Sequence, residues 1–322
     1  MTYTSGGLIQ ATDYNGFVND TAGANVNNVW GTGSGDAGWG QSALATVSAT
    51  NTITATQWAS LVNTLTNMGA QTGTTITSRS APTAGQTISI LAALNTDLTN
   101  ITANRQNAVA NGTQFTGWTG TNSKTAGTSG NPWTITFTNT VTWASADAAR
   151  YFFNAGGRIK IDVSKTATGT TGDPEWNDLA NTLCGDIFIT GGSATQTIAG
   201  TSYTGTTKIG GTGTPNTLAT TTGWNDLTAG AAATIVYKQF ADTAPYTSNY
   251  IQHAIAKGAS SNTLVITTTW FANDGDPISG GTASSGATPG TAPTTIVTYF
   301  PPSTTYLPTT SWGTPSVSAT TA

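Results

Sequence analysis

The stretch from Trp133 to Val163 constrains the fold most strongly, because it holds two strand patterns separated by a short helical one. Residues 133–143 alternate large apolar side chains with Thr and Asn, which is the period of a half-buried strand. Ser145 can then cap a helix, and Asp147 suits the positive end of its dipole. Residues 157–164 resume the alternation. The sequence therefore predicts a strand, one or two helical turns, and a second strand.

The helical turns of this unit carry an aromatic face formed by Tyr151, Phe152 and Phe153. Asn154 and Gly156 can adopt the left-handed conformation that ends a helix. We expect the sheet to be built around this aromatic plug. The unit contains no residue pattern that is typical of catalysis.

Short strand patterns with Gly- and Thr-rich turns fill most of the chain beyond this unit. They cover residues 185–190, 195–199, 206–210, 232–240, 248–257, 262–272 and 294–300. A short helix is expected at Asp173–Leu183, with Asp173 as cap and Pro174 at its first position. The predicted fold class is mainly β, with an antiparallel β-sandwich or jelly-roll-like C-terminal domain preceded by a helical N-terminal region.

The N-terminal hundred residues are predicted to be mainly helical. Apolar residues favour a first helix over 12–30, although Gly16 and Gly23 weaken that pattern. Thr54 can cap a second helix whose apolar stripe ends at Gly69, and residues 88–109 form a third helical pattern.

A glycine-rich run, Gly31–Gly40, separates the first two of these helices. It is expected to be a flexible or tightly turned loop. A phosphate-binding loop would need a preceding strand and a following Lys-Ser/Thr, and both are missing.

The 322 residues are enough for two domains or one large β domain with an appendage. We expect a helical docking region at 1–112 and a Gly/Thr-rich linker at 113–132. The β-sandwich domain is expected at 133–302. The Thr/Ser/Pro-rich residues 303–322 are expected to form an extended tail that lies on a neighbouring subunit.

Charged residues make up only 7% of the chain, against about 25% in ordinary soluble domains. Low charge suggests that sister subunits cover much of the surface. The net charge of −4 and the scattered basic residues argue against nucleic-acid binding.

Apolar runs fall short of the roughly 18 residues of a membrane span. The first residues lack a secretory signal pattern, so synthesis in a cytoplasm is expected.

Four groups of residues could have indicated chemistry, but none forms a convincing site. Cys184 is the single cysteine, so an intrachain disulfide is excluded and a buried thiol is expected. His253 is the single histidine and lacks an accompanying nucleophile elbow. Glu175 would need an aspartate across a cleft to act as a glycosidase pair. Asp274 and Asp276 resemble a calcium loop only loosely, and ordinary turn chemistry is favoured. We therefore expect no enzyme, catalytic residue, cofactor or metal.

Four of the ten tryptophans fall in Gly/Thr-rich loops: Trp39, Trp118, Trp224 and Trp312. An exposed indole could stack on a sugar ring of a glycan. Burial at a subunit interface is the favoured interpretation.

Several segments together resemble virion structural proteins of tailed bacteriophages, especially those infecting cyanobacteria. The resemblance is carried by residues 31–41, 47–58, 71–73 and 146–159, of which Asp147-Ala-Ala-Arg-Tyr-Phe-Phe-Asn-Ala-Gly-Gly157 is the most specific phrase. A basic residue and a histidine commonly precede the Gln-Thr-Gly in that family. Here Asn67-Met-Gly-Ala70 stands instead, so no role of that histidine is carried over.

The resemblance implies a structural part of the particle, belonging to the tail, its fibres or its baseplate, and it brings no catalytic residues. We expect a non-enzymatic virion protein, located in the virion, that assembles as a homotrimer and contacts other virion proteins. Two alternatives stay open. One is a capsid decoration protein. The other is a protein for host attachment that binds, or less expectedly hydrolyses, a surface glycan.

Overall fold

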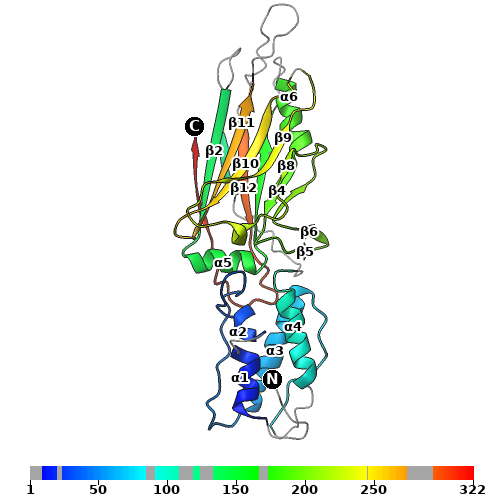
Figure 1. Ribbon diagram of the computed structural model, residues 1–322, viewed down its shortest axis with the longest axis vertical. Helices are drawn as coiled ribbons and strands as arrows, with labels where there is room; N and C mark the ends of the chain where they lie inside the picture. The colour runs from blue at the N-terminus through cyan, green and yellow to red at the C-terminus, as the bar shows by residue number, and fades with distance from the viewer. Residues whose placement is uncertain are drawn as a thin grey trace, which may run out of the picture.

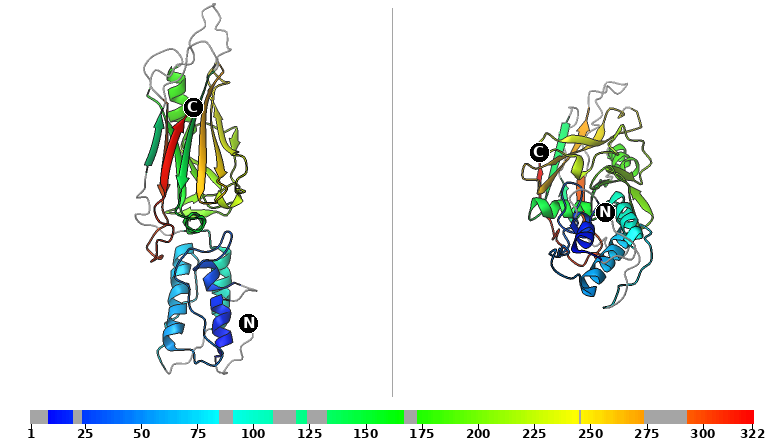
Figure 2. Two further views of the ribbon diagram at one scale, coloured as in Figure 1. Left: turned by 90° about the vertical axis from the view of Figure 1, so that its left-hand side faces the viewer. Right: turned by 60° about the horizontal axis from the view of Figure 1, so that its bottom comes forward.

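The computed structural model describes residues 9–19, 24–84, 91–108, 119–123, 133–166, 173–244, 246–273 and 293–322. The molecule is elongated, with a helical part at one end and a β-sandwich at the other (Figure 1). Figure 2 shows these two parts stacked end to end. Among the described helices, none has the length and apolarity needed to cross a membrane.

The helical part is built from α1 (Ala11–Asn19), α2 (Val26–Val29), α3 (Ala55–Thr72) and α4 (Leu91–Ala103). The single helix expected over 12–30 is in fact two. The second of them starts at its own cap, because the Asn25 side chain accepts a hydrogen bond from the Asn28 N–H at 2.8 Å.

Helix α3 begins where the sequence predicts and ends one turn later. Thr54 and Gln57 form a reciprocal capping box at its start. The predicted stop at Gly69 is wrong, because the helix runs to Thr72 and ends at Gly73 with φ 64°. Gly69 lies under Ile76, whose methyl group would be 3.1 Å from an added Cβ. The glycine is therefore kept inside the helix by close packing, at a cost of about 1 kcal/mol relative to Ala.

The sandwich consists of two antiparallel sheets, which confirms the predicted mainly β fold class. The five-stranded sheet contains, in spatial order, β1 (Thr119–Ser123), β12 (Thr294–Phe300), β3 (Arg158–Ser164), β4 (Asp186–Ile189) and β7 (Thr206–Ile209). The six-stranded sheet contains β13 (Ser316–Thr321), β2 (Trp133–Thr142), β11 (Thr263–Ala272), β10 (Tyr250–Lys257), β9 (Thr234–Phe240) and β8 (Thr217–Leu218). A separate hairpin joins β5 (Gln196–Ile198) to β6 (Thr201–Tyr203).

Every strand predicted from alternation is present, and four further short strands are not predicted. Strand β1 lies within the 113–132 stretch expected to be a linker, where it pairs with β12. Strand β13 lies within the expected tail and pairs with β2. Strands β6 and β8 are only three and two residues long. None of these segments shows a sustained apolar alternation, because they are short or lie at sheet edges.

The predicted helix over 173–183 is confirmed, although its second half is wound more widely. Helix α6 (Asp173–Asp178) continues as the π-helical turn η1 (Leu179–Cys184). A buried face that includes Leu179 and Leu183 holds this turn against the sandwich.

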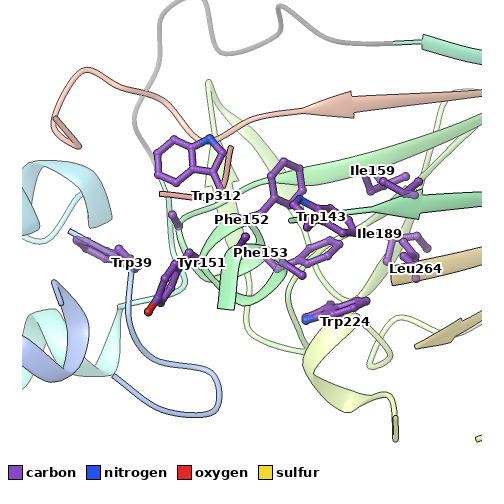
Figure 3. Packing of buried hydrophobic residues seen from close by; sticks show 14 of the residues in the cluster. Trp39, Trp143, Tyr151, Phe152, Phe153, Ile159, Ile189, Trp224, Leu264 and Trp312 are labelled. Carbon is purple, nitrogen blue, oxygen red and sulfur yellow. The ribbon is translucent and has the colours of Figure 1, made fainter. Parts of the chain in front are cut away.

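Helix α5 (Ala146–Asn154) closes the end of the sandwich that faces the helical part (Figure 1). Ser145 caps it by accepting the Ala148 N–H at 3.0 Å. Phe152 and Phe153 are fully buried, and Phe153 stacks on Trp224 with ring centroids 5.0 Å apart. Phe152 and Phe153 form the predicted aromatic plug, whereas the Tyr151 ring, which is also expected in it, lies against Gly40 on the side of the helical part (Figure 3).

Candidate functional site

Among the described residues, the contact between α5 and the loop Gly31–Gln41, here called the junction loop, has the most hydrogen bonds between the two parts. The Arg150 guanidinium donates to the carbonyl oxygens of Ala37 at 2.6 Å and Thr32 at 2.8 Å. Asp147 accepts a further hydrogen bond from it at 2.9 Å. Because a guanidinium holds its donors in one plane, these bonds fix the loop against the helix.

Asn154, at the end of α5, connects three segments through one buried amide. Its Nδ2 donates to the Ala37 carbonyl oxygen at 2.9 Å. Its Oδ1 accepts from the Asn225 Nδ2 at 3.0 Å, and Asn225 belongs to the short helix η2 (Trp224–Asp226). The side chain is 1% exposed, so losing either bond would leave a buried polar group unpaired.

The junction loop is tightly turned, which settles the two alternatives that its sequence allows. Gly38 has φ +89°, and an added Cβ would lie 2.1 Å from the Thr32 carbonyl oxygen. Gly40 has φ +67°, and its added Cβ would lie 2.4 Å from the Tyr151 ring. Only glycine fits these two positions.

Residues 301–315, here called the strap, pass over the junction loop on their way to β13. Gln41 donates to the Thr309 carbonyl oxygen at 2.7 Å and accepts the Thr309 N–H at 2.8 Å. The Ser311 hydroxyl donates to the Gly40 carbonyl oxygen. Leu307 and Trp312 are buried. For residues 303–315 of the strap, the expectation of a tail lying on a neighbour is therefore wrong, because apolar anchors and amide bonds hold this segment on its own chain.

Helix α3 also reaches the junction, through Gln71, whose Nε2 donates to the Ala155 carbonyl oxygen at 3.1 Å. Three of the four segments that carry the resemblance, 31–41, 71–73 and 146–159, thus meet at one place. From the sequence, Asn154 is expected only as a left-handed residue that ends the helix, which is wrong because it is the last helical residue of α5. Arg150 and Gln71 are not singled out from the sequence. What could have pointed to Arg150, Asn154 and Gln71 is that they lie within the segments that carry the resemblance.

A polar groove runs beside this contact. It comprises two recesses of about 470 and 460 Å³ that share Asp36, Asn225 and Asp226. Six charged residues line it: Asp36, Arg105, Asp147, Arg150, Asp226 and Lys257. The chain has only ten basic and fourteen acidic residues, 24 in all, so a quarter of its charge lies in this groove.

The charges of the groove compensate one another locally. Asp36 accepts hydrogen bonds from Arg105 at 2.5 Å and from Gln106 at 3.0 Å. The Lys257 Nζ lies 4.6 Å from the centre of the Trp224 ring. Burial lowers the pKa of Lys257, and the Asp226 carboxylate acts in the opposite direction. The groove therefore presents mixed donors and acceptors with little net charge.

The two single residues considered for chemistry are buried in the sandwich. His253 is fully buried, its Nδ1 lies 2.9 Å from the Thr268 hydroxyl, and its ring stacks on Tyr237. Burial lowers the pKa of His253 to about 3, so the ring is neutral at ordinary pH. Cys184 is a buried thiol as predicted, and burial raises its pKa to about 12.

Glu175 lies beside Asp178 and Asp242, and oxygen atoms of the three carboxylates are within 4.8 Å of one another. Burial, reinforced by the two neighbouring carboxylates, raises the pKa of Glu175. This trio involves α6, at the end of the sandwich remote from the junction (Figure 1). Asp274 and Asp276 lie outside the described residues.

Three of the four loop tryptophans are interior residues. Trp39, Trp224 and Trp312 are 1%, 2% and 3% exposed. Trp39 and Trp312 flank Tyr151 at the junction, and Trp224 lies against the plug (Figure 3). These three side chains are buried within their own chain, so the expectation that they stack on a sugar or lie at a subunit interface is wrong. Their glycine neighbours permit close packing rather than exposure. Trp118 lies outside the described residues.

The fold and the junction define a mainly β protein whose antiparallel sandwich is fixed to a helical part by reciprocal hydrogen bonds. Comparisons with protein families, curated proteins and solved structures found no match for this chain.

Proposed function

We propose that this protein is a non-enzymatic structural component of a tailed-phage particle, belonging to the tail, its fibres or its baseplate. The supporting observation is the convergence of three phage-like segments on the bonded contact between helical part and sandwich. A fixed contact between two parts lets an elongated subunit hold a defined shape. If the helical part docks on the particle, the fixed contact would orient the sandwich relative to the particle.

The surface suits close packing of identical copies. Its low charge reduces electrostatic repulsion between neighbouring subunits. Ile235, 45% exposed, is the one exposed large apolar side chain among the described residues. Contacts between copies would therefore be made largely by Thr, Ser and Asn. Stable obligate interfaces bury roughly 2,000 Å² or more, and a homotrimer meets this through side-by-side contact of elongated subunits.

The test is to label purified particles with an antibody against the protein and to measure its copy number by mass spectrometry. Label on tails or baseplates with few copies per particle supports the proposal. Label on capsids with hundreds of copies would identify a capsid decoration protein instead. Absence of the protein from purified particles would overturn both.

A second candidate function, binding of a host glycan, is favoured by the polar groove. Sugar hydroxyls both donate and accept hydrogen bonds, and the groove offers partners of both kinds, because its carboxylates accept, its Arg and Lys side chains donate and its amides do both. A glycan array with the wild type and Asp226→Ala tests it. Binding that this substitution removes would support the groove, and retained binding would place the glycan elsewhere.

A further inference from the structure

The C-terminal strand β13 is attached to the sandwich with little apolar burial. It pairs with β2 from Ser316 opposite Thr142 to Thr321 opposite Phe137. Two more hydrogen bonds, of 2.8 and 2.9 Å, join Thr136 to Ala322. No residue of β13 is buried. The strand is therefore held by its ladder of backbone hydrogen bonds and by half-buried Val317, which packs against the core.

The strand that receives β13 would be an unprotected edge without it. Strand β2 contains no charged residue and no proline, and it pairs with β11 over ten residues without a register shift. Natural proteins blunt exposed edges with charges, prolines or bulges, because a plain edge pairs with any available strand. Among the described strands, β13 alone covers this edge. An incoming strand of the same sequence would meet the same ladder.

A short hinge separates β13 from the anchored strap. Trp312 is 3% exposed and β13 begins at Ser316, so the hinge is the last three residues of the strap, of which Gly313 and Thr314 are exposed and Pro315 is buried. Gly313 has φ 61° and donates its N–H to the Thr310 carbonyl oxygen at 2.9 Å. Rotation at this glycine would direct β13 away from its own sheet. Three residues span about 10 Å, so a receiving copy would have to lie alongside.

We propose that β13 is exchanged between copies of this protein, each copy placing its residues 316–322 on the β2 edge of a neighbour. The inference rests on the proposed function in supposing that copies assemble. Exchange loses no ladder bond, because every bond made within one chain is remade between chains. It links neighbouring subunits without an exposed apolar patch, which agrees with the surface described above.

A disulfide between β13 and β2 reports which chain supplies the strand. Thr140 and Ser318 are directly opposed, and directly opposed residues of antiparallel strands lie within disulfide range. The Thr140→Cys/Ser318→Cys variant is assembled, oxidised and run on a denaturing, non-reducing gel. The proposal predicts covalently linked oligomers. The control is Thr138→Cys/Thr267→Cys, which joins β2 to β11 and should give only internal cross-links. Cys184 is buried and stays unreactive.

The outcomes separate the exchange from the assembly. Oligomers by mass photometry whose 140–318 cross-links are all internal would overturn strand exchange and leave the proposed assembly standing. A monomer at all concentrations with internal cross-links would overturn both. Thr142→Cys/Ser316→Cys repeats the measurement at a second opposed pair. Failure of both pairs to cross-link would mean that β13 leaves β2 unpaired, which also contradicts the proposal.

Discussion

Gln41 and Thr309 are 268 positions apart and form two hydrogen bonds with each other, one in each direction. The Gln41 side-chain amide thereby satisfies the backbone N–H and carbonyl oxygen of Thr309, as the backbone of a paired strand would. The same device recurs in the helical part, where Asn27 bonds to both backbone groups of Leu44 and Asn15 to both of Val47. In a chain with few charges, amides make the connections that ion pairs make elsewhere.

Gln41→Glu should destabilise the protein by about 1–3 kcal/mol, because the carboxylate cannot donate to Thr309 and the position is buried. Chemical denaturation measures the loss, and hydrogen exchange should show faster opening of the strap. Asn95→Asp, at an exposed position of α4, is the matched amide-to-acid control and should cost little. Equal losses in both variants would contradict the role given to Gln41.

Arg150→Lys should loosen the junction loop while leaving the sandwich folded. A lysine can replace the charge beside Asp147 but cannot bond to the Thr32 and Ala37 carbonyl oxygens in one plane. Hydrogen exchange should therefore accelerate within 31–40. The control is Arg105→Lys, which changes the partly exposed pair with Asp36 and should cost at most about 1 kcal/mol. Unchanged exchange in Arg150→Lys would show that the loop is held by other contacts.

Phe153→Ala should cost about 3–5 kcal/mol, because it removes a fully buried ring that packs on Trp224 and Phe152. Thermal or urea unfolding provides the measurement. Phe240→Ala, at a half-buried position in β9, should lower the unfolding free energy less. An equal loss of unfolding free energy in the two variants would show that the plug contributes no more to stability than a half-buried ring does.

Acidification should destabilise the protein through His253. Its pKa is about 3 when folded, against about 6.5 when unfolded, so the unfolded chain binds the extra proton between these values. The ring thus leaves stability unchanged above pH 6.5 and reduces it as the pH falls toward 3. Urea midpoints measured from pH 7 to pH 4 should fall more steeply in the wild type than in His253→Gln. Parallel pH profiles would contradict a neutral buried histidine.

The sequence predicts the fold well where side chains alternate between interior and surface. The strands of the sandwich, the Ser145 cap and the aromatic plug all follow from such local patterns. The strap and β13 could not be predicted, because their order depends on distant partners such as Gln41 and β2. The junction tryptophans were misjudged for a related reason, since glycine neighbours fit both an exposed loop and a tight turn. Trp39 packs edge-on against Trp30 and lies near Tyr151, which is far away in the sequence (Figure 3).

The central claim is that the junction fixes the helical part rigidly to the sandwich, as a shape-holding subunit requires. The most direct measurement is the distance distribution between spin labels on Asn63→Cys in α3 and Thr234→Cys in β9, both exposed positions. We predict a single narrow distribution that broadens in Arg150→Lys. A broad or two-peaked distribution in the otherwise unchanged protein would contradict the account.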